Sequence, residues 1–156
     1  MATANVDRAL EALESHAGRL NRVSDEANEK LVEIENRIVK MNIGMEYWYS
    51  PAVKRDDATG TFSREGTSEE LIQVLGFARV AGRWCLAIKP IRLVKGYFQG
   101  DENCPFEDQY AGGDIVPLLK TSRDLRVAAL LVLEDFLARF TEHVVSATEA
   151  IKKAKV

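Results

Sequence analysis

Apolar and small side chains in the first quarter of the chain recur at alternating steps of four and three residues, which is the heptad pattern of a long amphipathic helix. With Leu10 at position a, the polar Ser24 also falls at an a position in the middle of the pattern. The d positions are Leu13, Leu20, Ala27, Ile34 and Met41. A continuous helix over residues 6–41 would be roughly 55 Å long at 1.5 Å per residue. It would extend beyond the core of a small domain.

The predicted helix has a candidate break and a candidate end. Ser24 followed by Asp25 and Glu26 resembles an N-cap with acidic residues in the first turn, so an alternative interpretation divides the helix near residues 21–24. We favour a continuous helix. Asn42 and Gly44 then provide left-handed positions at which it ends.

Two partners could cover the apolar stripe of this helix. In one interpretation the helix pairs with its copy in a second subunit, and in the other it packs antiparallel on the carboxy-terminal helix of its own chain. The flanking charges decide little, because only Lys30 and Glu35 would attract each other between parallel copies. Both interpretations stay open, and we expect a homodimer. The candidate self-association residues are Leu20, Ala27, Leu31, Ile34 and Ile38.

Three segments rich in β-forming residues follow the first helix. Residues 43–50 form the first expected strand, and residues 71–80 and 84–94 form a hairpin around a tight turn at Ala81 and Gly82. A two-residue turn fixes the register of the hairpin and creates one bulky face. The opposite face carries mainly small side chains, so another backbone could approach it closely. The expected pairs on the bulky face are Arg79 with Trp84, Phe77 with Leu86, and Leu75 with Ile88.

The remaining segments carry loop and helix signals. Residues 54–70 are polar and turn-rich, and we expect a mobile loop or a loose hairpin there. Residues 99–114 hold five acidic side chains and are expected to form a long loop. Thr121 with Asp124 resembles a capping box that opens a final helix over residues 122–155, which is apolar all round between residues 127 and 133. Its expected core residues are Leu130, Leu133, Phe136, Leu137 and Phe140, packed against Trp84, Leu86 and Phe77.

Together these elements predict a single α+β domain over residues 1–156 with the order α-β-β-β-α. Its parts are a long heptad-patterned helix over residues 1–42, a three-stranded antiparallel meander within residues 43–98, an acidic loop over residues 99–120 and a core helix over residues 121–155. A chain of 156 residues suits one domain of ordinary size.

Composition and charge limit the classes of partner. A net charge of −3 provides no overall attraction for nucleic acid or for an anionic membrane. The longest apolar run, residues 127–133, is far shorter than the ~20 residues that cross a bilayer, so we expect no membrane association. Cys85 and Cys104 lack metal-ligand spacing, and the first residues lack the pattern of a secretory signal. We therefore expect a cytoplasmic protein.

One cluster of side chains supports a binding hypothesis. Residues 79–95 contain five basic side chains and no acid, with Trp84 among them and Tyr97 and Phe98 just after, as in sites that bind nucleic acid. The expected strand pairing distributes these basic side chains over both faces of the hairpin, which favours a solvated edge instead. Nucleic acid is thus an alternative partner that we do not favour. The candidate nucleic-acid or anion contacts are Arg79, Arg83, Trp84, Lys89, Arg92 and Lys95.

The sequence predicts no catalytic, cofactor-binding or metal-binding residue. Nucleophile elbows, phosphate loops, dinucleotide-binding glycine motifs and zinc-helix motifs do not occur in it. The five acids of residues 99–114 lack the oxygen spacing of an EF-hand. His16 and His143 have no neighbouring cysteine or paired histidine. A hydrolase built from carboxylates that are distant in sequence remains an alternative.

Two segments resemble small bacterial and phage proteins of uncharacterised function. They are residues 24–49 (SDEANEKLVEIENRIVKMNIGMEYWY) and residues 117–130 (PLLKTSRDLRVAAL). The resemblance rests on a helix that runs into a strand beginning at a glycine, and on a final helix opened by Ser-Arg-x-Leu-Arg. It implies a bacterial or phage origin and transfers no catalytic residue. The function we expect from the residues is that of a non-enzymatic assembly or adaptor protein acting through helix surfaces, with a nucleic-acid accessory protein and a hydrolase as alternatives.

Overall fold

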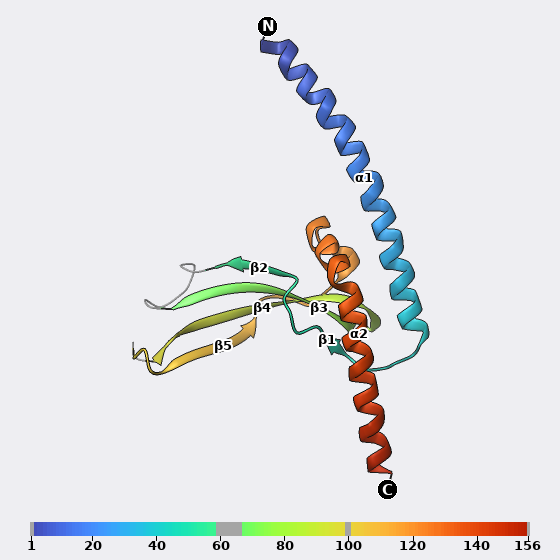
Figure 1. Cartoon of the computed structure of the whole chain (residues 1–156), viewed down its shortest axis with the longest axis vertical. Helices are drawn as coiled ribbons and strands as arrows, with labels where there is room; N and C mark the ends of the chain where they lie inside the picture. Colours follow the sequence, from blue (N-terminus) through green and yellow to red (C-terminus); the bar gives the residue numbers. More distant parts are fainter. Residues whose placement is uncertain (1, 59–66, 99–100, 156) are drawn as a thin grey trace.

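Two long helices and a curled antiparallel sheet make up the α+β fold (Figure 1). The computed structural model describes residues 2–58, 67–98 and 101–155. Helix α1 spans Ala2–Lys40, helix α2 spans Arg123–Ala154, and the short 3-10 helix η2 spans Leu118–Lys120. The strands of the described residues are β1 (Tyr47–Trp48), β2 (Lys54–Asp57), β3 (Ser68–Val80), β4 (Arg83–Tyr97), β5 (Pro105–Ala111) and β6 (Val116–Pro117).

A long hairpin of β3 and β4 forms the centre of the sheet. Its tight turn has positive φ angles of 48° at Ala81 and 80° at Gly82, which suits the twist of two antiparallel strands. The predicted register is confirmed: Arg79 lies opposite Trp84, and the two pairs that follow it along the hairpin are also as expected. Strands β1 and β2 pair with β3, whereas β5 and β6 pair with β4.

The prediction of three strands is wrong, because the described residues contain six. Strand β2 lies in the segment expected to be a loop at residues 54–70, and β5 lies in the expected acidic loop. Both are short strands at the sheet edge whose side chains are nearly all exposed, so they lack the apolar alternation that marks a strand in sequence. Residues 59–66 and 99–100 of those two segments lie outside the described residues.

Helix α1 is continuous, with no break at residues 21–24, and it ends where predicted. Asn42 and Gly44 after it have positive φ angles of 52° and 66°. Helix α2 begins one residue later than the predicted capping box implies, because Ser122 is the N-cap and its hydroxyl accepts a hydrogen bond from the backbone N–H of Leu125.

The two helices run in the same direction side by side, so the predicted antiparallel packing is wrong (Figure 1). At the start of α2, the guanidinium of Arg123 donates a hydrogen bond of 3.0 Å to Asn21, near the middle of α1. The chain returns through β6 and η2 to this point before α2 begins, and from there α2 follows the second half of α1. The first half of α1 extends past the rest of the molecule.

The main core lies between the bulky face of the hairpin and the two helices. Leu133, Phe136 and Phe140 of α2 are buried there as predicted, whereas Leu130 and Leu137 are partly buried. The ring of Phe140 lies 5.7 Å from that of Phe77 and stacks on Tyr47 of β1 at 5.1 Å, between centroids. From α1, the core receives Leu31 and Ile38.

An aromatic ring lies against the opposite face of the hairpin, where the small side chains allow a close approach. Trp48 of β1 lies directly on Gly76, where an added Cβ atom would be only 2.1 Å from the ring atom Cε3. The amino group of Lys89 lies 4.2 Å from the centre of the Trp48 ring. Beside this ring, Ile72, Val74 and Leu93 form a second, smaller core.

Candidate functional site

The first half of α1 carries an apolar surface that no other element of the described residues covers. Residues 3–23, here called the free half of α1, are exposed at every position except Ala17. Five large apolar side chains on it are 50–63% exposed, and all of them except Val23 follow the heptad spacing of one helix face. We call these four residues the α1 stripe: Val6, Leu10, Leu13 and Leu20.

The same heptad positions are buried in the second half of the helix. Ser24, Leu31 and Ile38 occupy successive a positions, and they are 8%, 0% and 4% exposed. Own-chain elements cover two of them, since Leu31 and Ile38 belong to the main core with residues of α2, β4 and η2. The face that points at α2 after residue 24 is therefore the face that is bare before it.

The structure divides the five self-association candidates between these two halves. Leu31 and Ile38 are buried in the chain's own core, Ile34 packs against that core, and Ala27 is half-buried. Leu20 alone among them belongs to the exposed stripe. The other exposed apolar side chains of this face of α1 lie nearer the amino terminus than these candidates, at Val6, Leu10 and Leu13.

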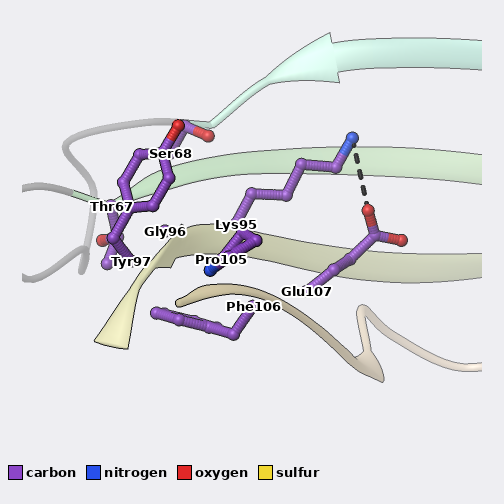
Figure 2. Close-up of a pocket in the computed structure, with 8 residues that line it drawn as sticks. All are labelled: Thr67, Ser68, Lys95, Gly96, Tyr97, Pro105, Phe106 and Glu107. Atoms are coloured by element: carbon purple, nitrogen blue, oxygen red, sulfur yellow. Dashed lines mark ion pairs between the residues drawn. The ribbon is translucent and has the colours of Figure 1, made fainter. Parts of the chain in front are cut away.

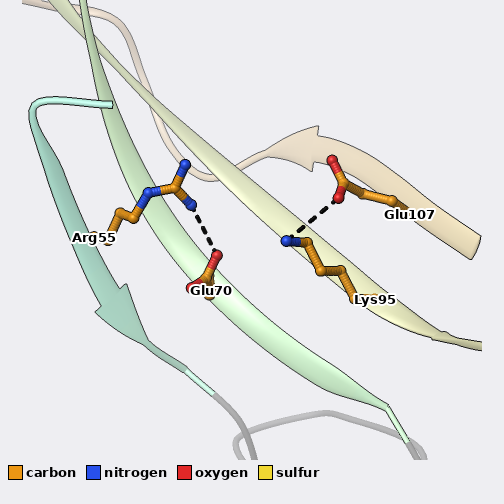
Figure 3. Close-up of polar contacts among 4 residues, drawn as sticks. All are labelled: Arg55, Glu70, Lys95 and Glu107. Atoms are coloured by element: carbon orange, nitrogen blue, oxygen red, sulfur yellow. Dashed lines mark hydrogen bonds and ion pairs between the residues drawn. The ribbon is translucent and has the colours of Figure 1, made fainter. Parts of the chain in front are cut away.

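The candidate nucleic-acid contacts are spread along the hairpin, and several have partners within the chain. Arg92 forms an ion pair with Glu69 at 3.0 Å and lies over the ring of Tyr110 at 5.2 Å. The amino group of Lys95 pairs with Glu107 at 3.4 Å across β4 and β5 (Figure 3).

The members nearer the hairpin turn are engaged as well. Arg79 donates to the carbonyl of Gly82 at 3.2 Å, and Lys89 lies over Trp48. Trp84 stacks on Phe77 with 5.4 Å between ring centroids, so its face is used in the core. Arg83 is exposed, on the strand next to the half-buried Glu35. These side chains do not converge on one surface.

A shallow hollow lies at the end of the sheet far from the helices (Figure 2). It encloses about 610 Å³ between the end of β4 and the start of β5. The Lys95–Glu107 ion pair lies at its edge, so the two charges there neutralise each other. The lining residues include no histidine or cysteine: they are Thr67, Ser68, Lys95, Gly96, Tyr97, Pro105, Phe106 and Glu107. A second cross-strand pair, Arg55 with Glu70 at 3.0 Å, lies on the neighbouring strands (Figure 3).

Two carboxylates attach the helices to the sheet, and no pattern in the sequence predicted either contact. The half-buried Glu35 of α1 accepts a hydrogen bond of 2.9 Å from the backbone N–H of Leu86 in β4, and burial raises the pKa of Glu35. On α2, Asp135 accepts a hydrogen bond from the hydroxyl of the buried Tyr49 and pairs with Arg139 at 3.0 Å. That hydrogen bond, followed by burial, raises the pKa of Tyr49, so its phenol stays protonated.

The described residues contain no group of three or more His, Cys, Asp or Glu side chains placed to hold a metal ion. Within the same residues, neither helix has a stretch both long and apolar enough to cross a bilayer. Cys85 is buried and Cys104 is exposed, and neither forms a disulfide. The feature that most resembles a functional surface is therefore the α1 stripe.

Comparison with known proteins adds no family to this picture. No protein-family model matches the chain, and neither the curated proteins nor the solved structures contain a match to it.

Proposed function

We propose that this is a non-enzymatic assembly protein that self-associates through the α1 stripe. The observation that supports the proposal most directly is the exposure of Val6, Leu10, Leu13 and Leu20 on one face of a helix that extends past the rest of the fold. Exposed apolar surface of this kind is typical of protein interaction sites. The heptad spacing is the pattern by which helices pair with one another.

The free half of α1 also needs a partner to be a stable helix. A helix segment without packing partners gains little stability in water, because most helical stability in proteins comes from packing of an apolar face. Gly18 lies in its interior, where glycine costs about 1 kcal/mol relative to alanine. The first turn carries no acidic residue to stabilise the helix dipole. A second helix against the stripe would offset these deficits.

The size of the stripe indicates a reversible contact. Full burial of a leucine or valine side chain contributes about 1.5–3 kcal/mol, so a side chain that is half exposed has about half of that left to gain. The eight stripe residues of two copies could then contribute roughly 6–12 kcal/mol in total. Association costs about 4–15 kcal/mol in lost freedom of motion, which is the same order. Only the upper end of this gain with the lower end of this cost leaves the ~8 kcal/mol that micromolar dissociation requires, so we expect a weak, reversible dimer rather than a permanent one.

The experiment that tests this function is the solution mass of the full chain between about 1 and 100 μM. The unmodified protein should rise from monomer to dimer with concentration in sedimentation analysis. The double substitution Leu10→Glu and Leu13→Glu should keep it monomeric, because it places four buried charges at the centre of the contact.

A matched control separates the stripe from a general effect of charge. Ala12 and Gly18 lie on the outward positions of the same helix, and Ala12→Glu with Gly18→Glu adds the same charge as the stripe variant. This control should dimerise like the unmodified protein. A monomeric mass for the unmodified chain over the whole range would refute the proposal.

A further inference from the structure

We infer that the two copies pair with their α1 helices antiparallel, so that the sheets and α2 helices lie at opposite ends of the assembly. This inference rests on the proposed self-association and adds its geometry. It follows from where the apolar face of α1 changes from bare to covered, and from which residues an opposite helix would meet there.

The own-chain helix α2 excludes a parallel partner. A second α1 that ran parallel and in register would lie on the same face at every heptad, including residues 24–38. That part of the face is already occupied, since Leu31 and Ile38 are buried against α2, β4 and η2. The Asn21–Arg123 hydrogen bond marks the level at which α2 begins. An antiparallel partner avoids this obstacle, because beyond the free half it runs away from α2 rather than along it.

The stripe is complementary to itself in this orientation. In an antiparallel pair, a positions of one helix face d positions of the other. If Leu10 faces Leu13 of the second copy, then Val6 faces the second copy's Ala17, and Leu20 faces the second copy's Thr3. Each large side chain outside the central leucine pair is thus opposite a smaller one. A parallel pair would instead place Ala17 against Ala17 and leave a gap in the seam.

The length of this contact suits a weak dimer. Residues 3–20 span about 27 Å of helix at 1.5 Å per residue. At 25 cal/mol per Å², the half-exposed stripe residues of two copies would remove roughly 240–480 Å² of apolar surface from water. That is small beside the ~1,200–2,000 Å² of a standard interface, so a second copy that exchanges readily fits the stripe better than a permanent partner.

One electrostatic cost accompanies the antiparallel orientation. With Leu10 at position a, Asp7 and Glu14 are e positions, and e positions of antiparallel helices face each other. Asp7 of each copy would then lie opposite Glu14 of the other, twice per dimer. Exposed charges of this kind change an affinity by a factor of a few. A parallel partner would need the space that α2 already occupies, so this small repulsion does not reverse the orientation. The Asp7–Glu14 pair can instead be used as a test of it.

Disulfide trapping distinguishes the orientations directly. Val6→Cys and Ala17→Cys are prepared as two separate full-length proteins, each with Cys104→Ser to remove the exposed native thiol. In the antiparallel pair, residue 6 is next to residue 17 of the other copy, while the two copies of residue 6 are roughly 17 Å apart along the axis. Oxidation should therefore trap a dimer only when the two proteins are mixed.

The possible results are separable. A trapped dimer in the mixture alone supports the inference, whereas trapped dimers of each protein by itself would show a parallel pair and overturn it while leaving the proposed function intact. If oxidation traps a dimer neither in the mixture nor in each protein alone, the register that places residue 6 opposite residue 17 is wrong. A monomeric mass of the unmodified chain would remove the proposed function and, with it, this inference.

The charge pair provides an independent readout with a matched control. Glu14→Lys turns the repulsion with Asp7 of the second copy into attraction and should tighten the dimer about 3–10-fold at low salt, with less effect at high salt. Glu11→Lys makes the same charge change one position after Leu10, on the outward side of the helix, and should change the affinity little. Equal effects of the two substitutions would contradict the antiparallel register.

Discussion

Replacing Gly76 with alanine should disrupt the packing of Trp48 on the second face of the sheet. A Cβ atom at position 76 would lie 2.1, 2.5 and 2.6 Å from three atoms of the Trp48 ring, so the ring must move. Its displacement would also separate it from Lys89, which now lies 4.2 Å from the ring centre. Overpacking costs about 1–3 kcal/mol and an exposed cation–π contact about 0.5–1 kcal/mol, so we expect a loss of roughly 2–4 kcal/mol. Urea unfolding followed by tryptophan fluorescence measures this loss.

A second glycine provides the control for the added methyl group. At Gly18, in the exposed part of α1, an added Cβ atom meets nothing within 4 Å, so Gly18→Ala should stabilise the helix by about 0.5–1 kcal/mol or leave the protein unchanged. Combining Gly76→Ala with Trp48→Ala should cost less than the sum of the two single changes, because the clash is absent once the ring is gone. A loss below about 0.5 kcal/mol for Gly76→Ala would refute the close packing of Trp48 on the strand.

Three further predictions concern the turn, the core and the contact of α1 with the sheet. Ala81→Asn should stabilise the protein by about 0.5–1 kcal/mol in thermal or urea unfolding, because asparagine tolerates the left-handed backbone at φ 48° better than alanine; a loss would contradict the turn type. Leu133→Ala should cost roughly 2–5 kcal/mol, since this side chain is 5% exposed in the main core, and a loss under about 0.5 kcal/mol would place it outside that core. The folded pKa of Glu35 is raised above its ordinary value of 4.5, so the folded state binds more protons and the associated stability is lost as pH rises through the folded pKa. Relative to Glu35→Gln, the unmodified protein should therefore lose stability as pH rises from below 4.5 through the raised pKa, and a pH-independent difference in unfolding free energy would count against the burial of this carboxyl.

The parts of the fold that could be predicted from sequence are those in which apolar and polar residues alternate with the period of a strand or a helix, because one face is buried and the other is exposed. The β3–β4 hairpin combines long alternating strands with a two-residue turn, and its register follows from these two features alone. The core residues of α2 also follow from their spacing, as the burial of Leu133, Phe136 and Phe140 shows. In both cases burial on one face imposes a period on the sequence.

Strands β2 and β5, which the sequence analysis missed, show no such alternation of apolar and polar residues. Strand β2 consists of four charged residues, Lys54–Asp57, all exposed, and six of the seven positions of β5 are exposed. These edge strands form because a longer neighbour offers unpaired backbone groups, and that cause lies in the neighbour's sequence rather than in their own. The contact of Glu35 with the backbone of Leu86 could not be predicted either, because the residue type at position 86 does not show what its backbone N–H binds.

The α1 stripe could be predicted from the sequence only in part. The heptad pattern of α1 was visible throughout, but the pattern is the same whether the helix packs on its own chain or on a second copy. Only the position of the rest of the fold separates the two roles, because α2 begins beside Asn21 and the a positions from Ser24 onward are buried. A single uninterrupted stripe thus contains a segment that stabilises the fold and a segment that is free to bind. This division explains why Leu31 and Ile38, which look equivalent to Leu10 in the sequence, should unfold the monomer when replaced by charges, whereas Leu10 should only release the partner.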